Sequence, residues 1–423
     1  MVGANIGGWM VLEPWITPSL FYRFLGKTHS EGVGMSQWTF CEALGAEEGN
    51  KLLKAHWDAW LTEDYIKKLA DSEVELVRLP IGDWTLKQYG PYHGCTDGAK
   101  EKITWALDRF AEHGIKVLLD VHAVRGSQNG FDNSGMQHRL AWIDETHFVH
   151  HEIQVGEWMG PWNGKGYDYI DWNNLLWAQD TMKGLVDEWG HHPAVYAMEP
   201  VNEPQDATDQ WALKIFYRNV RYIMRQGAPH LKFVFHDSGH LTPADWDDLF
   251  ADDDIENVVL DNHFYRAWSG DNTDVDTVCK AYKDHLEMIA GHKYEVWMGE
   301  WSLATDDCAF WLGNFNDGGS PGNCQWVDCP KPYLSGDLAV DLDRDAYMQG
   351  PYGTDPDVAM YGKCPIDSAK FSHEEVAAIG KCIFEGFDAN IQGQTMWTFR
   401  NELEPRWDYL KAYELGLIPS KNN

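Results

Sequence analysis

Eight short runs of apolar and β-branched residues recur along this chain of 423 residues, and segments with helical periodicity separate most of them. Such alternation is typical of βα units around a parallel sheet, and eight units favour a closed barrel over an open sheet. The predicted strands are residues 4–6, 74–79, 116–121, 195–198, 232–235, 258–260, 296–298 and 394–399. The predicted helices are residues 46–70, 99–113, 174–189, 208–226, 276–290 and 373–388, with a short helix at 243–250 and Thr208 or Asp209 as the cap of the fourth. We therefore predict one α/β domain over residues 1–423, a (β/α)8 TIM barrel.

The barrel alone needs about 250 residues, so the remaining residues must lie in loops. Three long segments follow predicted strands, at 18–45, 126–173 and 302–368. Loops of this kind deepen the C-terminal face of a barrel, where barrel enzymes hold their sites. No change in composition marks a second domain.

Charge narrows the classes of partner. The 66 acidic residues exceed the 34 Lys and Arg residues, which gives a net charge of −32. Such a chain repels phosphate backbones and anionic lipids, so we expect no nucleic acid and no membrane partner. Trp, with 22 residues, outnumbers both Phe and Tyr. Indole faces suit sugar rings, but a large aromatic core explains the same count, and composition does not decide between them.

Polar and aromatic residues stand at the ends of most predicted strands. They are Glu13, Arg78, His122, Asn202, Glu203, His263, Tyr265, Glu300 and Trp397. One such residue alone would be explained by helix capping or by a satisfied backbone group. Because seven of the eight strands share the feature, we predict a functional site at the mouth of the barrel.

Two carboxylates, Glu203 and Glu300, follow the fourth and seventh strands and are predicted to face each other. Glycoside hydrolysis uses such a pair, one as general acid and one as nucleophile or base. Asn202 is placed to bind a sugar 2-hydroxyl, His263 and Tyr265 to orient Glu300, and Arg78 to keep it ionised. Trp397 offers a stacking surface. The chain has no G-x-S-x-G nucleophile elbow between a predicted strand and helix, and it has no phosphate-binding G-x-x-x-x-G-K-[ST] loop.

The cluster His147-Phe-Val-His150-His151-Glu152 is the alternative chemical feature. Its spacing is tolerable for a metal, but we place it in a loop without helix register and interpret it as not metal-binding. We predict neither a metal nor a cofactor.

The quoted residues resemble glycoside hydrolase family 5, and within it the fungal exo-β-1,3-glucanases. The similarity runs from Asn-Ile-Gly-Gly-Trp at 5–9 to Arg-Trp at 406–407, and it is most specific in Val-Arg-Leu-Pro-Ile-Gly at 77–82 and Gly-Ser-Gln-Asn-Gly-Phe-Asp-Asn-Ser-Gly at 126–135. The resemblance implies a retaining mechanism with Glu203 as acid/base and Glu300 as nucleophile.

The remaining strand-end residues would then line the subsite of the terminal glucose, beside Asp132. Phe131 matches one side of an aromatic clamp for the next sugar, and Trp268 stands at the partner position. The loops at 144–173 and 312–363 depart from the family pattern and would close a pocket or add subsites.

The resemblance also bears on the eight cysteines. Cys308 and Cys364 resemble a bridged pair of the fungal enzymes, which leaves Cys324 with Cys329, while neighbouring barrel positions suggest Cys41 with Cys95 and Cys279 with Cys382. Disulfides indicate secretion. No signal peptide opens the chain, so we expect a secreted monomer whose leader has been removed.

We predict an exo-acting retaining β-1,3-glucanase that binds β-glucan or a β-glucoside. An endo-acting β-glucanase, for example on β-1,6 links, and a glycosidase of small aryl or lipid glucosides are alternatives within the class. A glucan-binding protein without catalysis is the alternative from another class, and release of reducing sugar from laminarin would separate it from the enzymes.

Overall fold

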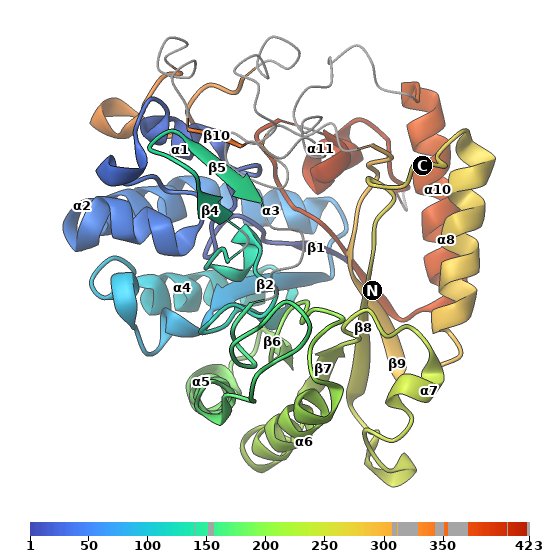
Figure 1. Ribbon diagram of the computed structural model, residues 1–423. Helices are drawn as coiled ribbons and strands as arrows, with labels where there is room; N and C mark the ends of the chain where they lie inside the picture. Colours follow the sequence, from blue (N-terminus) through green and yellow to red (C-terminus); the bar gives the residue numbers. More distant parts are fainter. Residues whose placement is uncertain are drawn as a thin grey trace.

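Eight parallel strands close into a barrel in the computed structural model, which describes residues 1–138, 140–150, 156–306, 311, 329–342, 351–353, 371–403 and 405–420 (Figure 1). The strands are β1 (Val2–Asn5), β2 (Leu76–Gly82), β3 (Lys116–Ala123), β6 (Val195–Glu199), β7 (Lys232–His236), β8 (Val258–Phe264), β9 (Glu295–Trp301) and β11 (Gly393–Met396). Around the barrel they follow the order β1-β11-β9-β8-β7-β6-β3-β2. The predicted fold and all eight predicted strands are confirmed.

Helices surround the barrel. They are α1 (Pro18–Phe21), α2 (Gln37–Trp60), α3 (Glu63–Asp71), α4 (Ala99–Glu112), α5 (Trp172–Trp189), α6 (Gln210–Gly227), α7 (Pro243–Trp246), α8 (Val275–Ile289), α10 (His373–Asn390) and α11 (Tyr409–Glu414). The prediction of one helix over 46–70 was wrong, because Leu61 is extended and the Thr62 side chain accepts a hydrogen bond from the Tyr65 amide, which starts α3 as a separate helix. The predicted loop at 18–45 also contains α1 and the first turns of α2. Asp209 caps α6 by accepting from the Ala212 amide.

The N-terminal end of the barrel is filled by apolar side chains. Leu76, Leu118, Ala197, Val234, Val259 and Trp297 form a separate buried cluster. Four of them belong to the first half of their strands, and Ala197 and Val234 stand at the middle of theirs, so this layer closes the N-terminal end of the barrel. Buried polar residues of the strands, such as Asp120, Glu199 and Glu300, follow this layer toward the carboxyl end.

A small second sheet lies outside the barrel. It joins β4 (Leu140–Trp142), β5 (His147–His150) and β10 (Tyr352–Gly353) in the order β10-β5-β4, and it connects the long loops after β3 and β9. The prediction that the cluster beginning at His147 lies in a loop was wrong for His147–His150, because an antiparallel hairpin with β4 orders them. The His147 ring nitrogen contacts Asp144 at 3.1 Å.

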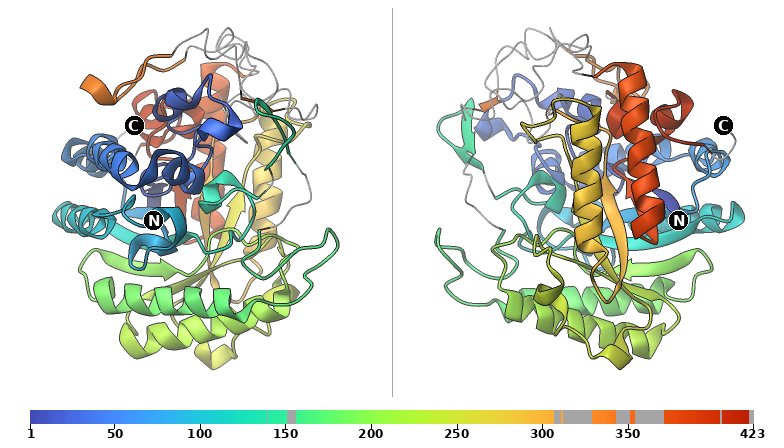
Figure 2. Two further views of the ribbon diagram at one scale, coloured as in Figure 1. Left: turned by 60° about the vertical axis from the view of Figure 1, so that its left-hand side comes forward. Right: turned by 90° about the vertical axis from the view of Figure 1, so that its right-hand side faces the viewer.

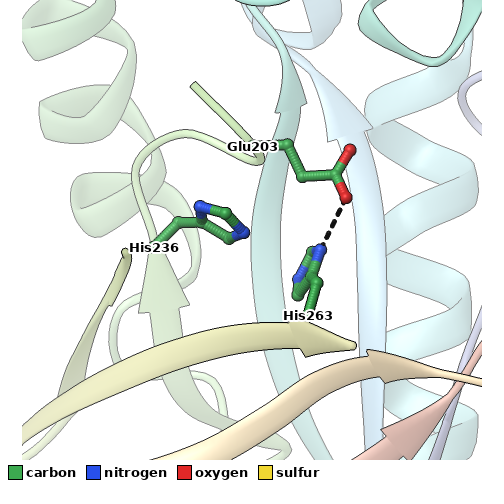
Figure 3. Close-up of side chains that lie close together, drawn as sticks. All are labelled: Glu203, His236 and His263. Atoms are coloured by element: carbon green, nitrogen blue, oxygen red, sulfur yellow. Dashed lines mark hydrogen bonds and ion pairs between the residues drawn. The ribbon is translucent and has the colours of Figure 1, made fainter. Parts of the chain in front are cut away.

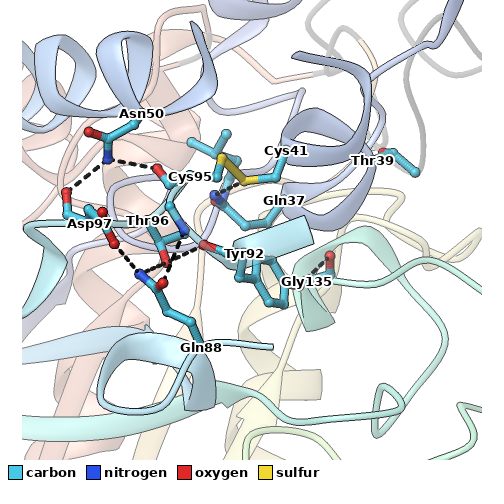
Figure 4. The surroundings of a disulfide bond; sticks show 12 residues. Gln37, Thr39, Cys41, Asn50, Gln88, Tyr92, Cys95, Thr96, Asp97 and Gly135 are labelled. Atoms are coloured by element: carbon cyan, nitrogen blue, oxygen red, sulfur yellow. Dashed lines mark hydrogen bonds between the residues drawn. A yellow bond between two sulfur atoms is a disulfide. The ribbon is translucent and has the colours of Figure 1, made fainter. Parts of the chain in front are cut away.

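Two of the predicted disulfides are confirmed. Cys41–Cys95 ties α2 to the segment before α4, where the Asn50 amide donates to the carbonyls of Cys95 and Asp97 (Figure 4). Cys279–Cys382 joins α8 to α10, which run side by side (Figure 2, right). Cys329 is also disulfide-bonded, but the predicted pairs Cys308–Cys364 and Cys324–Cys329 include residues outside the described part of the chain. Within that part, no helix has the length and apolarity needed to cross a bilayer.

Candidate active site

The Arg78 guanidinium is the centre of the polar groups at the carboxyl end of the barrel. It is fully buried and donates to Glu199 at 3.0 Å, to Glu300 Oε1 at 2.9 Å and to Asn202 Oδ1 at 2.6 Å. Asp120 lies 3.1 Å from the same guanidinium. A buried cation needs such compensation, since unpaired charges are costly to bury. Arg78, on β2, therefore fixes residues of three other strands, β3, β6 and β9, and of the loop after β6 relative to one another.

Glu300 lies near the end of β9, opposite His263 of β8 in the strand register. Its Oε2 accepts a 2.7 Å hydrogen bond from the Tyr265 hydroxyl, and its Oε1 accepts from Arg78. Burial raises the pKa of Glu300, and the neighbouring positive charge of His263 partly offsets that rise. Two donors on one carboxylate stabilise its ionised form.

Glu203 lies in the loop after β6, with a backbone φ of 41° in the left-handed region. Its Oε1 is 2.8 Å from His263 Nδ1, and its Oε2 accepts from Asn133 Nδ2 at 3.2 Å. Burial opposes ionisation of Glu203, but the hydrogen bond and charge of His263 hold its pKa well below the ordinary value. His263 Nδ1 thus contacts Glu203 and also lies 3.5 Å from Glu300 Oε2.

The groups around His263 favour its cationic form, with a hydrogen on both ring nitrogens. Burial lowers the pKa of an imidazole, but the charges of Glu300 and Asp261 raise the pKa of His263 well above its ordinary value. The ring reaches Asp261 through Nε2 at 3.3 Å. The proton of the His263–Glu203 pair can therefore lie on the imidazole, or on the carboxyl after transfer along the 2.8 Å contact, without any change in the total number of protons.

His236, at the end of β7, completes a group of three with Glu203 and His263 (Figure 3). Nitrogen or oxygen atoms of the three residues lie within 4.8 Å of one another. The Ser238 amide donates to His236 Nδ1 at 2.9 Å, and burial, together with the positive charge of His263, lowers the pKa of His236 to about 3. The ring is therefore neutral with its hydrogen on Nε2, which makes Nε2 a donor and not a metal ligand in this tautomer.

Three predicted residues present buried polar atoms that have no partner among the described residues. These atoms are Glu13 Oε1, His122 Nε2 and Asn202 Nδ2. His122 is held by Asp120 at 2.6 Å, and its ring stacks on Trp397 with centroids 5.2 Å apart. Glu13 accepts from Trp15 Nε1 at 3.0 Å. A ligand rich in hydroxyl groups offers such atoms both donors and acceptors.

An aromatic row leads out from Glu300. Tyr265 contacts Trp407 at 5.3 Å between centroids and Trp268 at 5.5 Å, and Trp407 contacts Trp15 at 5.1 Å. Trp268 at the outer end is 53% exposed. Phe131 immediately precedes the turn Asp132–Ser134, whose Asn133 holds Glu203. The structure thus places Phe131 and Asp132 in the segment whose Asn133 contacts Glu203, and it places Trp268 against Tyr265. That Phe131 and Trp268 face each other across a sugar stays a prediction.

Several residues of this network escaped sequence reasoning. They are Asp120, Asn133, Glu199, His236, Asp261, Trp15 and Trp407. Side chains two residues apart share a face of a strand, so the spacing of Asp120 to His122 and of Asp261 to His263 carried a usable signal. Trp407 belongs to the Arg-Trp pair that ends the family resemblance, but it lies beyond the last predicted strand, so the strand-end argument did not assign it to the site.

The comparisons with known proteins agree with this architecture. The sequence profile of the cellulase family, glycosyl hydrolase family 5, matches residues 41–331. The chain is 29% identical to a protein named probable glucan 1,3-beta-glucosidase A of Aspergillus clavatus, over 99% of this chain and 87% of that protein. It is 25% identical to glucan 1,3-beta-glucosidase 2 of Candida albicans, over 99% of this chain and 83% of the other. Rutinosidase from Aspergillus niger shares the fold, with a TM-score of 0.64 and 15% identity over 98% of this chain and 96% of that one.

A parallel barrel with two buried carboxylates at its carboxyl end is an arrangement used by hydrolases that act on carbohydrates. Because the family profile covers more than half of the sequence, the chain belongs to glycosyl hydrolase family 5. It is a glycoside hydrolase with a carbohydrate substrate.

Proposed function

We propose that this enzyme is a retaining exo-β-1,3-glucanase, with Glu203 as acid/base and Glu300 as nucleophile. The observation that carries the proposal is the position of His263 Nδ1, which lies 2.8 Å from Glu203 Oε1 and 3.5 Å from Glu300 Oε2. The two oxygens cannot be further apart than the sum of these distances. For these two oxygens the limit is compatible with the roughly 5–5.5 Å between carboxyl groups that retention requires, and it supports a retaining mechanism.

The proposed first step breaks the glycosidic bond. A Glu300 oxygen attacks the anomeric carbon while Glu203 gives its proton to the departing oxygen, which leaves a glycosyl ester on Glu300 and a carboxylate on Glu203. Arg78 and Tyr265 keep Glu300 ionised and aimed before the attack. Transfer of the His263 proton to Glu203 supplies the acid form that this step needs.

The second step reverses these roles. The Glu203 carboxylate takes a proton from water, and the resulting hydroxide oxygen attacks the anomeric carbon and releases Glu300. Asn133 remains a donor to Glu203 in this carboxylate state, and the proton taken from water returns through Glu203 to His263 Nδ1 at the end of the cycle. The product keeps the β configuration, and the enzyme returns to its initial protonation.

The choice of β-1,3-glucan rests on the names of the fungal relatives and on the site. Trp397 stacked on His122 offers a flat surface for one glucose ring, and Asn202 Nδ2 offers a donor for its 2-hydroxyl. The disulfides support secretion, where an external glucan would be met.

Hydrolysis of laminarin, followed by NMR and product chromatography, tests the proposal. We expect β-glucose as the first product, loss of turnover in Glu300→Gln, and retained turnover of a dinitrophenyl glucoside by Glu203→Ala when azide is added, because azide needs no base. Mixed oligosaccharides with little glucose would favour the endo-acting alternative. Absence of reducing sugar from every β-glucan and aryl glucoside would favour the non-catalytic binding protein.

A further inference from the structure

Two exposed tryptophans lie outside the site described above. Trp172 is the first residue of α5 and is 41% exposed, and Trp211 is the second residue of α6 and is 65% exposed. Their rings meet edge to face, with centroids 5.9 Å apart and planes at 86°. Large apolar side chains in contact with water and with each other are unusual on the surface of a soluble domain unless they bind something.

The barrel topology places this pair at the catalytic end of the molecule. Each helix begins where a strand and its loop have ended, so the first turns of α5 and α6 lie toward the carboxyl ends of the strands. The two helices pack side by side (Figure 2, left). Trp211 follows Glu203 by only eight residues, which limits the separation of their Cα atoms to at most about 28 Å.

We propose that Trp172 and Trp211 form a platform that binds a β-glucan chain outside the catalytic pocket, on the leaving-group side of Glu203. The inference rests on the proposed function and adds to it the place where the polymer is held. Leu176 lies one turn beyond Trp172 and is 55% exposed, which extends the apolar surface along α5. Glu203 protonates the departing oxygen, so the loop that carries it and continues into α6 borders the part of the substrate that leaves.

A neutral saccharide suits this surface better than other ligands do. The C–H faces of a glucose ring pack on an indole face, and the second indole at nearly a right angle bounds the ring from the side. Asp171 and Asp209 cap the two helices at the same ends. Their charges, with the net charge of −32, disfavour nucleic acids, anionic lipids and acidic proteins.

The test measures polymer binding apart from hydrolysis. Trp172→Ala, Trp211→Ala and the double variant are made in the full chain carrying Glu300→Gln, and retardation by laminarin is followed in native gels. We expect the double variant to bind laminarin about tenfold more weakly. In the chain with Glu300 intact, its KM for laminarin rises while kcat/KM for an aryl β-glucoside stays unchanged.

Tyr222 provides the matched control. It lies on α6 eleven residues after Trp211, which is three turns further on the same side of the helix, and it is 66% exposed. Tyr222→Ala removes an exposed aromatic ring from the same helix face at the end remote from the loops, and it should bind laminarin like the parent. A melting temperature equal to that of the parent shows that the tryptophan variants keep their fold.

Three results would overturn the platform: unchanged laminarin binding in the double variant, an equal loss in Tyr222→Ala, or a sedimentation change showing that the tryptophans join two copies of the chain. Failure of the proposed function is distinguishable, because a parent enzyme that binds laminarin through the tryptophans but hydrolyses no β-glucan would refute the activity and leave the platform in place.

Discussion

His263 Nδ1 lies 2.8 Å from Glu203 Oε1 at the mouth of the barrel, a distance over which a proton can pass between the two side chains. Asp261 holds the far side of the imidazole at 3.3 Å. The charges of Glu300 and Asp261 overcome burial to raise the pKa of His263, while His263 overcomes burial to lower the pKa of Glu203. The pair therefore behaves as one titrating unit that can deliver a proton from either partner.

The first prediction concerns Tyr265→Phe. The variant removes the 2.7 Å donor to Glu300 Oε2, so the ionised carboxylate loses stabilisation and the pKa of Glu300, already raised by burial, rises further. The nucleophile works ionised, and activity is lost as the pH falls through its pKa. We expect the acidic limb of the kcat/KM profile to move to higher pH, with a loss of about 10- to 150-fold at the optimum.

Tyr282→Phe is the control for this shift. Tyr282 is a buried tyrosine that donates to the Ser302 carbonyl at 3.0 Å. Its variant should leave the acidic limb in place. An unmoved limb in Tyr265→Phe would contradict the role assigned to Glu300.

The second prediction concerns His236→Phe. The Ser238 amide fixes the hydrogen of His236 on Nε2, and this donor can reach Glu203 through closer approach or one bridging water. Its loss destabilises the Glu203 carboxylate and raises the pKa of Glu203. Because Glu203 must be protonated for the first step, we expect the basic limb of kcat/KM to move to higher pH.

The turnover of a dinitrophenyl glucoside, which depends on Glu203 as a base, should fall about tenfold in the same variant. His236→Gln, whose side-chain amide N–H can take the place of Nε2–H, should recover part of the loss. If both variants keep the parent's pH profile, His236 only fills space.

The sequence alone was sufficient to predict the barrel and the residues at the ends of its strands. A β strand buried on both sides reads as a short apolar run, and residues at its carboxyl end must lie at the mouth wherever the barrel closes. Glu203, Glu300, Arg78 and Tyr265 were therefore placed together without coordinates.

Features that depend on contacts between residues far apart in the sequence could not be predicted from strand patterns. Trp407 meets Tyr265 and Trp15 only because the chain after β11 returns to the mouth. The tautomer of His236 depends on a backbone amide two residues away, which no residue pattern records. The small sheet was also not predicted, because β10 pairs with β5 across about two hundred residues of sequence.

The third prediction concerns the Cys279–Cys382 bridge. It closes a segment of 103 residues between α8 and α10, so replacing both cysteines with serine should lower the free energy of unfolding by about 4 to 5 kcal/mol. Urea unfolding measures the loss. The Cys41–Cys95 bridge closes a shorter segment, of 54 residues. Replacing both of its cysteines with serine should therefore lower the free energy of unfolding by about half a kcal/mol less. Unchanged stability in both variants would show that the unfolded chain is not restrained by these loops.

The last prediction concerns Trp268→Ala and the choice between one terminal glucose and an open cleft. Trp268 is half exposed and rests on Tyr265, which holds Glu300, so its ring can bind the second sugar without contacting the reacting bond. Binding energy from that remote sugar lowers the barrier of the chemical step. We expect kcat/KM for laminari-oligosaccharides to fall about tenfold while an aryl glucoside is almost unaffected.

Phe131→Ala should show the same selectivity if the two rings clamp one sugar. The double variant should then lose little more kcat/KM for laminari-oligosaccharides than either single variant, because removing one ring already abolishes binding of the sugar between them. Equal losses on both substrates would instead mean that Trp268 supports Tyr265 structurally, and a shifted acidic limb would accompany them. A parallel change in products, from glucose to mixed oligosaccharides, would identify these rings as the groups that limit the enzyme to chain ends.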